Sequence, residues 1–220
     1  MTESKGWNWA MNFEGKDVWK SPALESYGLM NRWGALGFRV FLDLGCGLGR
    51  HSVLFAKHGF RVCSFDFSPE AVESTRKWAE EENLHLDCRV GDMRELPYED
   101  NSFDCILGWN VINHTDTEGV KKTVSEIRRV LRPGGECYLT LLSKSAWSWK
   151  QDWPLIDENT KLRLEEGPEY GIPHFFADKE TLETLFREFE ILGISHVENW
   201  GRNNKGIHYH MHVKNPAEKQ

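Results

Sequence analysis

The sequence predicts an α/β protein: a doubly wound, mostly parallel sheet with helices on both faces, forming a three-layer sandwich. From residue 40 onward, short apolar runs alternate with stretches of helical periodicity, which is typical of βαβ units. A hydrophobic fraction of 40% is enough for a full core. The chain of 220 residues shows no internal repeat or low-complexity linker, so we expect a single domain over 1–220.

The part of the chain up to residue 142 is expected to contain five strands joined by helices. The expected strands are 40–44 (VFLDL), 61–67 (RVCSFDF), 84–90 (LHLDCRV), 103–109 (FDCILGW) and 136–142 (ECYLTLL). The expected helices are 50–59, which Gly59 ends; 69–83, which Ser68 caps and Pro69 opens; and 117–131, which RPGG at 132–135 closes.

The C-terminal part follows a different pattern. Asp178 caps a helix with an apolar face of Leu182, Leu185 and Phe186. Two strands then follow at 190–198 and 206–214, joined by a turn rich in Gly and Asn, and we expect them to form an antiparallel hairpin at the sheet edge.

Two segments, 1–39 and 145–177, are aromatic, polar and predicted to be irregular. We expect them to lie beyond the strand ends, where open α/β sheets bind ligands. The first would be an N-terminal extension or lid, and the second a substrate-side insertion between the fifth and sixth strands.

Charge and hydropathy narrow the possible partners. The net charge of −7 gives no overall basic footprint, so we expect no nucleic-acid partner. No apolar run is long enough to span a membrane, and the first residues lack a signal-peptide core, so we expect a soluble, cytoplasmic protein. The five cysteines form no C-x-x-C pair and are expected to be reduced.

A glycine-rich turn, GCGLG, directly follows the first strand and precedes a helix. Taken alone, Gly45, Gly47 and Gly49 could form an ordinary tight turn. Asp66, which ends the second strand 17 residues after Gly49, could accept hydrogen bonds from a ribose diol, although it could also be a neighbour of a helix cap. A dinucleotide site would require G-x-G-x-x-G, whereas the third glycine here comes one residue early.

The motifs LDLGCGLG with Asp66, GDM at 91–93 and LRPGGECYLT together resemble those of the class I S-adenosylmethionine-dependent methyltransferases. The resemblance covers about residues 38–144 and is nearest to the small-molecule branch that includes UbiE-like and tellurite-resistance-like enzymes. It implies a Rossmann-like sheet with one antiparallel strand in the order 3-2-1-4-5-7-6, and S-adenosylmethionine as the cofactor.

The resemblance also implies roles for individual residues. The glycines would lie along the methionine and ribose, Asp43 would help to place the amino group directly or through water, and Asp66 would hold the ribose hydroxyls. Asp92 would bind the adenine amino group beside Met93, and Trp109 and Asn110 would face the methionine. The full set of expected cofactor contacts is Asp43, Gly45, Cys46, Gly47, Gly49, Arg50, Asp66, Phe67, Asp92, Met93, Trp109, Asn110 and Trp19.

The sequence favours a small-molecule methyl acceptor. The motif typical of nucleobase-amine methylation, [DN]-P-P-[YF], is replaced by NVIN at 110–113. His114 is the best candidate for a catalytic base and His174 a second catalytic candidate, although each could instead have a structural role. A cofactor-binding protein without activity, and an RNA or protein methyltransferase, remain alternatives.

Histidine and tryptophan clusters suggest further possibilities. His208, His210 and His212 share one face of a strand and could bind a metal, but such a face is more often packed, and we expect no metal site. Trp7, Trp9 and Trp19 could close over the cofactor. Trp147, Trp149 and Trp153 could attract an amine acceptor, or could simply cover the strand ends.

Overall fold

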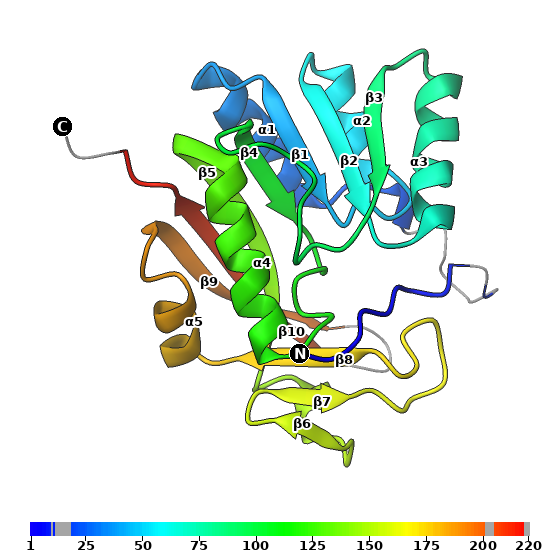
Figure 1. Ribbon diagram of the computed structural model, residues 1–220, viewed down its shortest axis with the longest axis vertical. Coiled ribbons are helices and arrows are strands. Elements are labelled where there is room, and N and C mark those ends of the chain that lie inside the picture. The colour runs from blue at the N-terminus through cyan, green and yellow to red at the C-terminus, as the bar shows by residue number, and fades with distance from the viewer. Residues whose placement is uncertain (10, 12–18, 201–204, 218–220) are drawn as a thin grey trace.

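The structure, a computed structural model, describes residues 1–9, 11, 19–200 and 205–217. Within them, seven strands of a ten-stranded sheet lie in the order β3-β2-β1-β4-β5-β10-β9 (Figure 1). Their bounds are β1 Val40–Leu44, β2 Arg61–Asp66, β3 Leu86–Val90, β4 Phe103–Gly108, β5 Leu131–Ser143, β9 Glu190–Trp200 and β10 Lys205–Lys214. Strands β1 to β5 are parallel, and β10 is antiparallel to both β5 and β9. The predicted order 3-2-1-4-5-7-6 is confirmed, because β9 and β10 are the sixth and seventh predicted strands.

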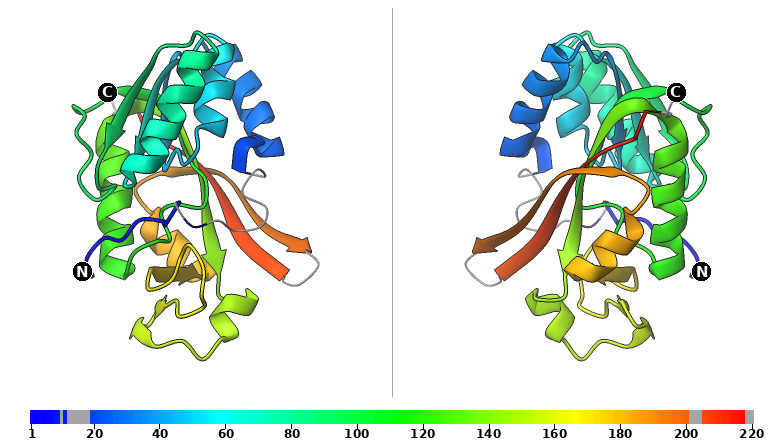
Figure 2. Two further views of the ribbon diagram at one scale, coloured as in Figure 1. Left: turned by 90° about the vertical axis from the view of Figure 1, so that its right-hand side faces the viewer. Right: turned by 90° about the vertical axis from the view of Figure 1, so that its left-hand side faces the viewer.

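Helices cover both faces of this sheet, as predicted. They are α1 Leu24–Ala35, α2 Arg50–Lys57, α3 Pro69–Glu81, α4 Thr117–Val130 and α5 Lys179–Leu185. Figure 2 shows α1 and α2 on one side of the sheet and α4 and α5 on the other. Side chains alternate along each strand, so Phe41 packs with α1 and α2 whereas its neighbour Leu42 packs in the cluster that includes α4 and α5.

The segment 145–177 is more ordered than the sequence predicts. It contains a short 3₁₀ helix, Trp147–Lys150, and strands β6 Leu155–Asp157, β7 Thr160–Leu162 and β8 Pro173–Ala177. Strand β8 pairs in parallel with the last two residues of β5, and β7 and β6 extend from it as an antiparallel hairpin (Figure 1). The prediction of an irregular segment is wrong: β6 and β7 have three residues each, too few to show an alternating pattern, and the five residues of β8 are all buried, so they do not alternate either.

Only the first part of segment 1–39 lies outside the core. Helix α1 contains Trp33, which is fully buried against Phe41 and Phe55. The indole of Trp33 donates to Glu136 on β5 at 2.9 Å, and Arg32 forms two hydrogen bonds with the same carboxylate. Helix α1 is therefore part of the core, and the described residues of this segment that extend over the strand ends precede it.

Strand β5 begins five residues earlier than predicted. The RPGG segment forms part of the strand instead of a separate turn. The N–H of Gly134 donates to the carbonyl of Asn215 at 2.8 Å, and the N–H of Asn215 donates to Gly135 at 2.9 Å. These partners lie some eighty residues further along the chain, so the local pattern of Pro and Gly could not show them.

The glycine turn is forced by crowding at the end of β1. Gly45 has a φ of +73°, and its N–H and that of Cys46 both donate to the carbonyl of Phe65 at the end of β2. A Cβ on Gly45 would lie 2.4 Å from a methyl carbon of Val111. The turn therefore needs glycine here both for its backbone angle and for space.

Asp43 lies buried beneath this turn, with 1% of its surface exposed. Its Oδ2 accepts a hydrogen bond from Ser52 at 2.6 Å, and Ser64 donates to Ser52 in turn. Burial raises the pKa of Asp43 to about 6, although the hydrogen bonds from Ser52 oppose the rise.

We expect Gly45→Ala to destabilise the fold more than the matched control Gly37→Ala. Gly37 also has a positive φ, but a Cβ there would meet nothing within 4 Å. Gly37→Ala should lower the free energy of unfolding by about 1–2 kcal/mol, because alanine disfavours the left-handed backbone conformation. Gly45→Ala should lower the free energy of unfolding by about 1–3 kcal/mol more than this, because Val111 must shift to make room for the methyl group. Urea unfolding measures both values, and equal losses would show that contact with Val111 is unimportant.

We expect Asp43→Asn to change how stability depends on pH. A carboxyl group with a raised pKa in the folded state stabilises the fold while it is protonated and loses this contribution as pH rises through the folded-state pKa. The unfolding free energy of the wild type, relative to Asp43→Asn, should fall by about 3 kcal/mol between about pH 4 and about pH 7. Urea unfolding of both proteins across this range tests it, and a constant difference would contradict it.

Candidate functional site

A pocket lies at the carboxyl edge of β1, β2 and β4, where the glycine turn leaves the sheet. It is lined by Ser4, Lys5, Gly6, Trp7, Trp9, Trp19, Leu44, Gly45, Cys46, Gly47, Leu48, Arg50, His51, Phe65, Asp66, Phe67, Gly91, Asp92, Met93, Trp109, Asn110, Val111 and His114. Most residues that the sequence predicts as cofactor contacts are among them. The exceptions are Asp43, which lies beneath the pocket, and Gly49.

Gly49 has a structural reason to be glycine. It precedes α2 with a φ of +95°, and a Cβ there would lie 2.9 Å from Oγ1 of Thr75 on α3. Gly49 therefore allows α2 to pack closely on α3, whereas Gly45 and Gly47 are exposed to the pocket.

Asp66 joins the glycine turn to the end of β2. Its Oδ2 accepts the N–H of Gly47 and its Oδ1 accepts the N–H of Ser68, each at 2.9 Å. Burial raises the pKa of Asp66, and these backbone hydrogen bonds oppose the rise. The carboxylate is thus held rigidly in the pocket wall, and each oxygen has a further lone pair to accept a hydrogen bond from a ligand.

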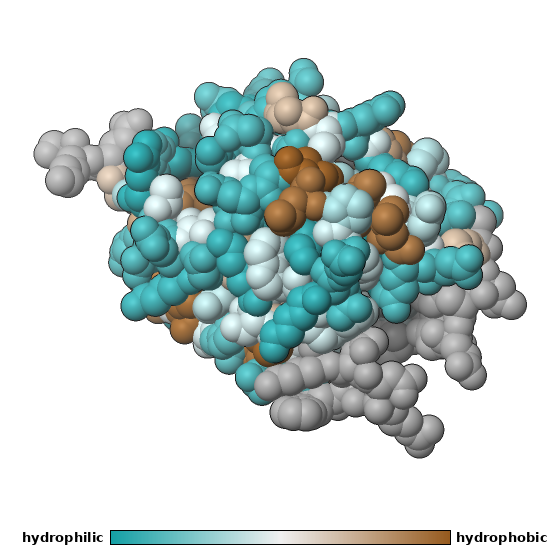
Figure 3. Space-filling model, turned by 90° about the horizontal axis from the view of Figure 1, so that it is seen from below, coloured by the Kyte–Doolittle hydropathy of each residue, from teal (hydrophilic) through white to brown (hydrophobic). Residues whose placement is uncertain are grey.

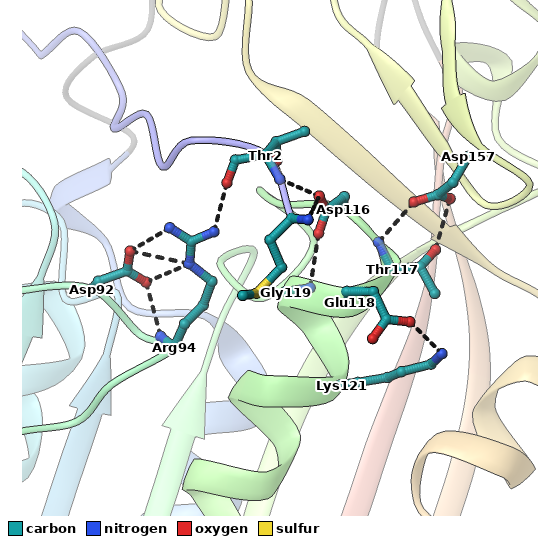
Figure 4. A network of polar contacts seen from close by, with 10 residues as sticks. Thr2, Asp92, Arg94, Asp116, Thr117, Glu118, Gly119, Lys121 and Asp157 are labelled. Atoms are coloured by element: carbon teal, nitrogen blue, oxygen red, sulfur yellow. Dashed lines mark hydrogen bonds and ion pairs between the residues drawn. The ribbon is translucent and has the colours of Figure 1, made fainter.

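Asp92 pairs with Arg94, which in turn contacts Thr2 in the N-terminal segment (Figure 4). The guanidinium of Arg94 contacts both oxygens of Asp92, with Nη2 2.7 Å from Oδ2, and it also donates to the carbonyl of Thr2. The hydroxyl of Ser4 donates to the same carboxylate. Burial alone would raise the pKa of Asp92, but hydrogen bonds from Arg94 and Ser4 lower it below its usual value.

Tryptophans of the N-terminal segment form the outer wall of the pocket. The rings of Trp7 and Trp9 lie 4.9 Å apart, those of Trp7 and Trp19 lie 5.1 Å apart, and the guanidinium of Arg50 stacks 4.9 Å from the ring of Trp19. A Cβ on Gly47 would lie 3.3 Å from the ring of Trp9. These aromatic side chains therefore sit directly over the glycine turn.

The end of β4 contributes a residue with an unusual backbone. Asn110 has a φ of +53°, and its N–H donates to Oγ1 of Thr140, which donates back to Oδ1 of Asn110 at 2.9 Å. A left-handed non-glycine residue beside a pocket is typical of functional sites. Trp109 stacks near Tyr138, with an interplanar angle of 8°.

The two predicted catalytic histidines lie together, with their ring centroids 5.0 Å apart. His114 lines the pocket, whereas His174 lies behind it and is 2% exposed. Glu169 lies between them: its Oε1 is 3.1 Å from Nε2 of His114 and 3.5 Å from Nε2 of His174. Burial lowers the pKa of His114 well below its usual value and lowers that of His174 to about 4. Because their pKa values are lowered, both His114 and His174 are neutral near neutral pH.

Sequence reasoning missed Glu169 and several pocket residues. Glu169 is 55 residues from His114 and lies in a polar loop, so no local signal marks it. His51 could have been noticed because it follows the glycine turn by two residues, whereas nothing in the sequence marks Lys5 as a pocket residue.

The other histidine and tryptophan clusters are engaged in local contacts. His210 and His212 on β10 pair with Tyr138 and Glu136, each at 2.9 Å, which agrees with a packed strand face. Trp149 faces Lys144 and Lys161, and Trp153 faces Arg163. Trp147, Trp149 and Trp153 are not among the residues that line the pocket, and the ring of Trp149 packs 5.2 Å from that of Phe176 on β8.

The surface on the β6–β8 side is mostly hydrophilic. Seen from below in Figure 3, hydrophobic residues form a few small brown patches among teal ones. Among the residues with a described position, no helix is both long and apolar enough to cross a membrane.

Comparisons with known proteins agree with this geometry. Residues 41–135 match the model of a methyltransferase domain. The chain is 32% identical over 114 residues to a ubiquinone biosynthesis O-methyltransferase from Methylocella silvestris, with 51% of this chain and 43% of the relative covered. The chain thus spans less than half the length of the first curated relatives that it matches.

A second relative matches over most of both chains. The demethylmenaquinone methyltransferase of Staphylococcus aureus is 33% identical over 199 residues, covering 84% of this chain and 78% of the relative. The crystal structure of a SAM-dependent methyltransferase from Methanosarcina mazei superposes with a TM-score of 0.70 at 23% identity, covering 81% of this chain and 93% of the other. With the fold, the glycine turn and Asp66 in place, this chain belongs to the class I S-adenosylmethionine-dependent methyltransferases.

Proposed function

We propose that this chain transfers the methyl group of S-adenosylmethionine to a small-molecule acceptor. The observation that carries the proposal is the Asp66 carboxylate, which the N–H groups of Gly47 and Ser68 hold in the pocket wall beside a glycine turn. A carboxylate at this point suits a ribose diol. The pocket also suits the rest of the cofactor, which contains no phosphate but carries an amino acid and a sulfonium.

Each part of the cofactor has a suitable partner in the pocket. Arg50 and the backbone of the glycine turn would bind the methionine carboxylate, and Asn110 would face its amino group. Asp92 and Met93 would border the adenine, although Asp92 already pairs with Arg94 and Ser4. Asp43, buried and hydrogen-bonded to Ser52, would act indirectly by supporting the turn.

Methyl transfer is an in-line displacement at a sulfonium carbon, so the main task of the protein is to align donor and acceptor. His114 would act on the acceptor side, since it lines the pocket, and His174 would act only through His114 and Glu169 because it lies behind the pocket wall. A small acceptor is supported by the aromatic cover over the pocket and by the acidic net charge of −7. Of the relatives named above, one is an O-methyltransferase of ubiquinone biosynthesis and the other a methyltransferase of demethylmenaquinone, which also favours a small acceptor.

The proposal predicts that the protein binds S-adenosylmethionine and S-adenosylhomocysteine but not NAD. Asp66→Ala should weaken S-adenosylhomocysteine binding by about 1–3 kcal/mol, because the ribose hydroxyls lose an acceptor. Isothermal titration calorimetry measures this. Asp87→Ala, which removes an exposed carboxylate on the neighbouring strand β3, is the matched control and should bind normally.

Four results would count against the proposal or a part of it. Unchanged affinity in Asp66→Ala would remove that residue from the site, and binding of NAD alone would overturn the cofactor assignment. Tight binding without transfer to any small molecule, protein or RNA acceptor would favour a non-catalytic cofactor-binding protein, and transfer to RNA or protein would favour the other alternative class.

The N-terminal segment is proposed to act as a lid, because Trp7, Trp9 and Trp19 cover the glycine turn. Removing residues 1–20 should raise the dissociation rate of S-adenosylhomocysteine several-fold, since the ligand loses its cover. Stopped-flow displacement measures the rate, and thermal unfolding checks that the core with α1 remains folded. An unchanged rate would leave these tryptophans as packing residues.

A further inference from the structure

We propose that His114, Glu169 and His174 form a binding site for a divalent transition-metal ion beside the cofactor pocket. One donor atom from each residue lies within 4.8 Å of the other two. Oε1 of Glu169 is 3.1 Å from Nε2 of His114 and 3.5 Å from Nε2 of His174. Two histidines and a glutamate are a common ligand set for zinc, and tetrahedral bonds of about 2.0–2.2 Å would place neighbouring donors about 3.3–3.6 Å apart, close to these two distances from Glu169.

The hydrogen-bonding pattern of His174 favours a metal over a simple hydrogen bond. Nδ1 of His174 is 3.0 Å from the carbonyl of Ile172. A carbonyl only accepts, so Nδ1 carries the hydrogen, and in the neutral ring Nε2 presents a lone pair. That lone pair faces Oε1 of Glu169, which is also an acceptor. A metal cation between these two atoms would satisfy both of them, and Nε2 of His114, which lies 3.1 Å from the same oxygen, could be its third ligand.

The surroundings of the cluster resemble the outer shell of a metal site. Histidine ligands usually donate their second ring nitrogen to a carbonyl or carboxylate, as His174 does to Ile172. Ligating carboxylates are in turn held by other groups, and here Nη1 of Arg163 pairs with Oε2 of Glu169. Arg163 also pairs with Glu165 at 2.8 Å, which fixes its direction. Arg163 therefore positions Glu169 with Oε1 directed at the two histidines.

The location suggests the chemical class of ligand that the ion would take. Three protein ligands leave a fourth tetrahedral position open, as in catalytic zinc sites. His114 brings the cluster to the pocket wall, so the open position would serve a hydroxyl or thiol of the methyl acceptor, an assignment that rests on the proposed function. The ion would lower the pKa of that group, which gives its proton to water. Its lone pair then forms the bond to the methyl carbon while the carbon–sulfur bond breaks and its electrons remain on sulfur.

Metal binding can be tested without cofactor or acceptor. Untagged protein, dialysed against chelator and then metal-free buffer, is titrated with Co²⁺ and separately with Zn²⁺. We expect one ion to bind per chain. Bound Co²⁺ should give a visible absorption spectrum typical of cobalt with a low coordination number, and bound Zn²⁺ should raise the thermal unfolding temperature of the protein. Glu169→Gln and His114→Gln should each abolish the spectrum and lower affinity by at least about tenfold.

Two control variants make the test specific. His85→Ala removes an exposed histidine and should retain one ion with unchanged affinity. Arg163→Met should retain the stoichiometry but weaken affinity by about 10–100-fold, the usual effect of losing an outer-shell partner. Absence of stoichiometric binding, or equal binding by Glu169→Gln and wild type, would overturn the metal site. Because cofactor binding is measured separately, loss of metal binding with intact S-adenosylhomocysteine binding would leave the proposed function standing.

Discussion

The left-handed turn that follows β1 is the constraint on which the rest of the site depends. The chain must leave the sheet at Gly45, where Val111 allows no side chain, and the N–H groups of Gly45 and Cys46 must share the carbonyl of Phe65. This ties the end of β1 to the end of β2, which places Asp66 beside Gly47. The pocket is therefore an outcome of how two neighbouring parallel strands end.

The N-terminal segment connects this cofactor side of the pocket to the segment that carries Glu169. Trp9 lies over Gly47, while the N–H of Asn8 donates to the carbonyl of Pro168 at 3.0 Å. Nζ of Lys5 donates to the carbonyl of Tyr170 at 2.7 Å. Glu169 lies between these two anchor points. The cover over the glycine turn and the histidine–glutamate cluster are thus held in place by the same short stretch of chain.

Buried carboxylates connect the parts of the fold that are distant in sequence. Glu136 on β5 receives hydrogen bonds from Arg32 and Trp33 of α1 and contacts His212 of β10. Asp116 caps α4 and also pairs with the N-terminus (Figure 4). In each case, a buried carboxylate is hydrogen-bonded by groups from several elements. These contacts therefore specify how the elements assemble.

The sequence by itself determined the sheet of parallel strands, the position of the turn at Gly45, Gly47 and Gly49, and the place of Asp66 at the end of the second strand. These features depend on short-range patterns: apolar runs, turn residues and the spacing of one βαβ unit. The sequence could not show that Glu169 lies between His114 and His174. That arrangement arises because β8 pairs with the end of β5 and brings its flanking loop across to the end of β4, and such long-range pairing leaves no local pattern.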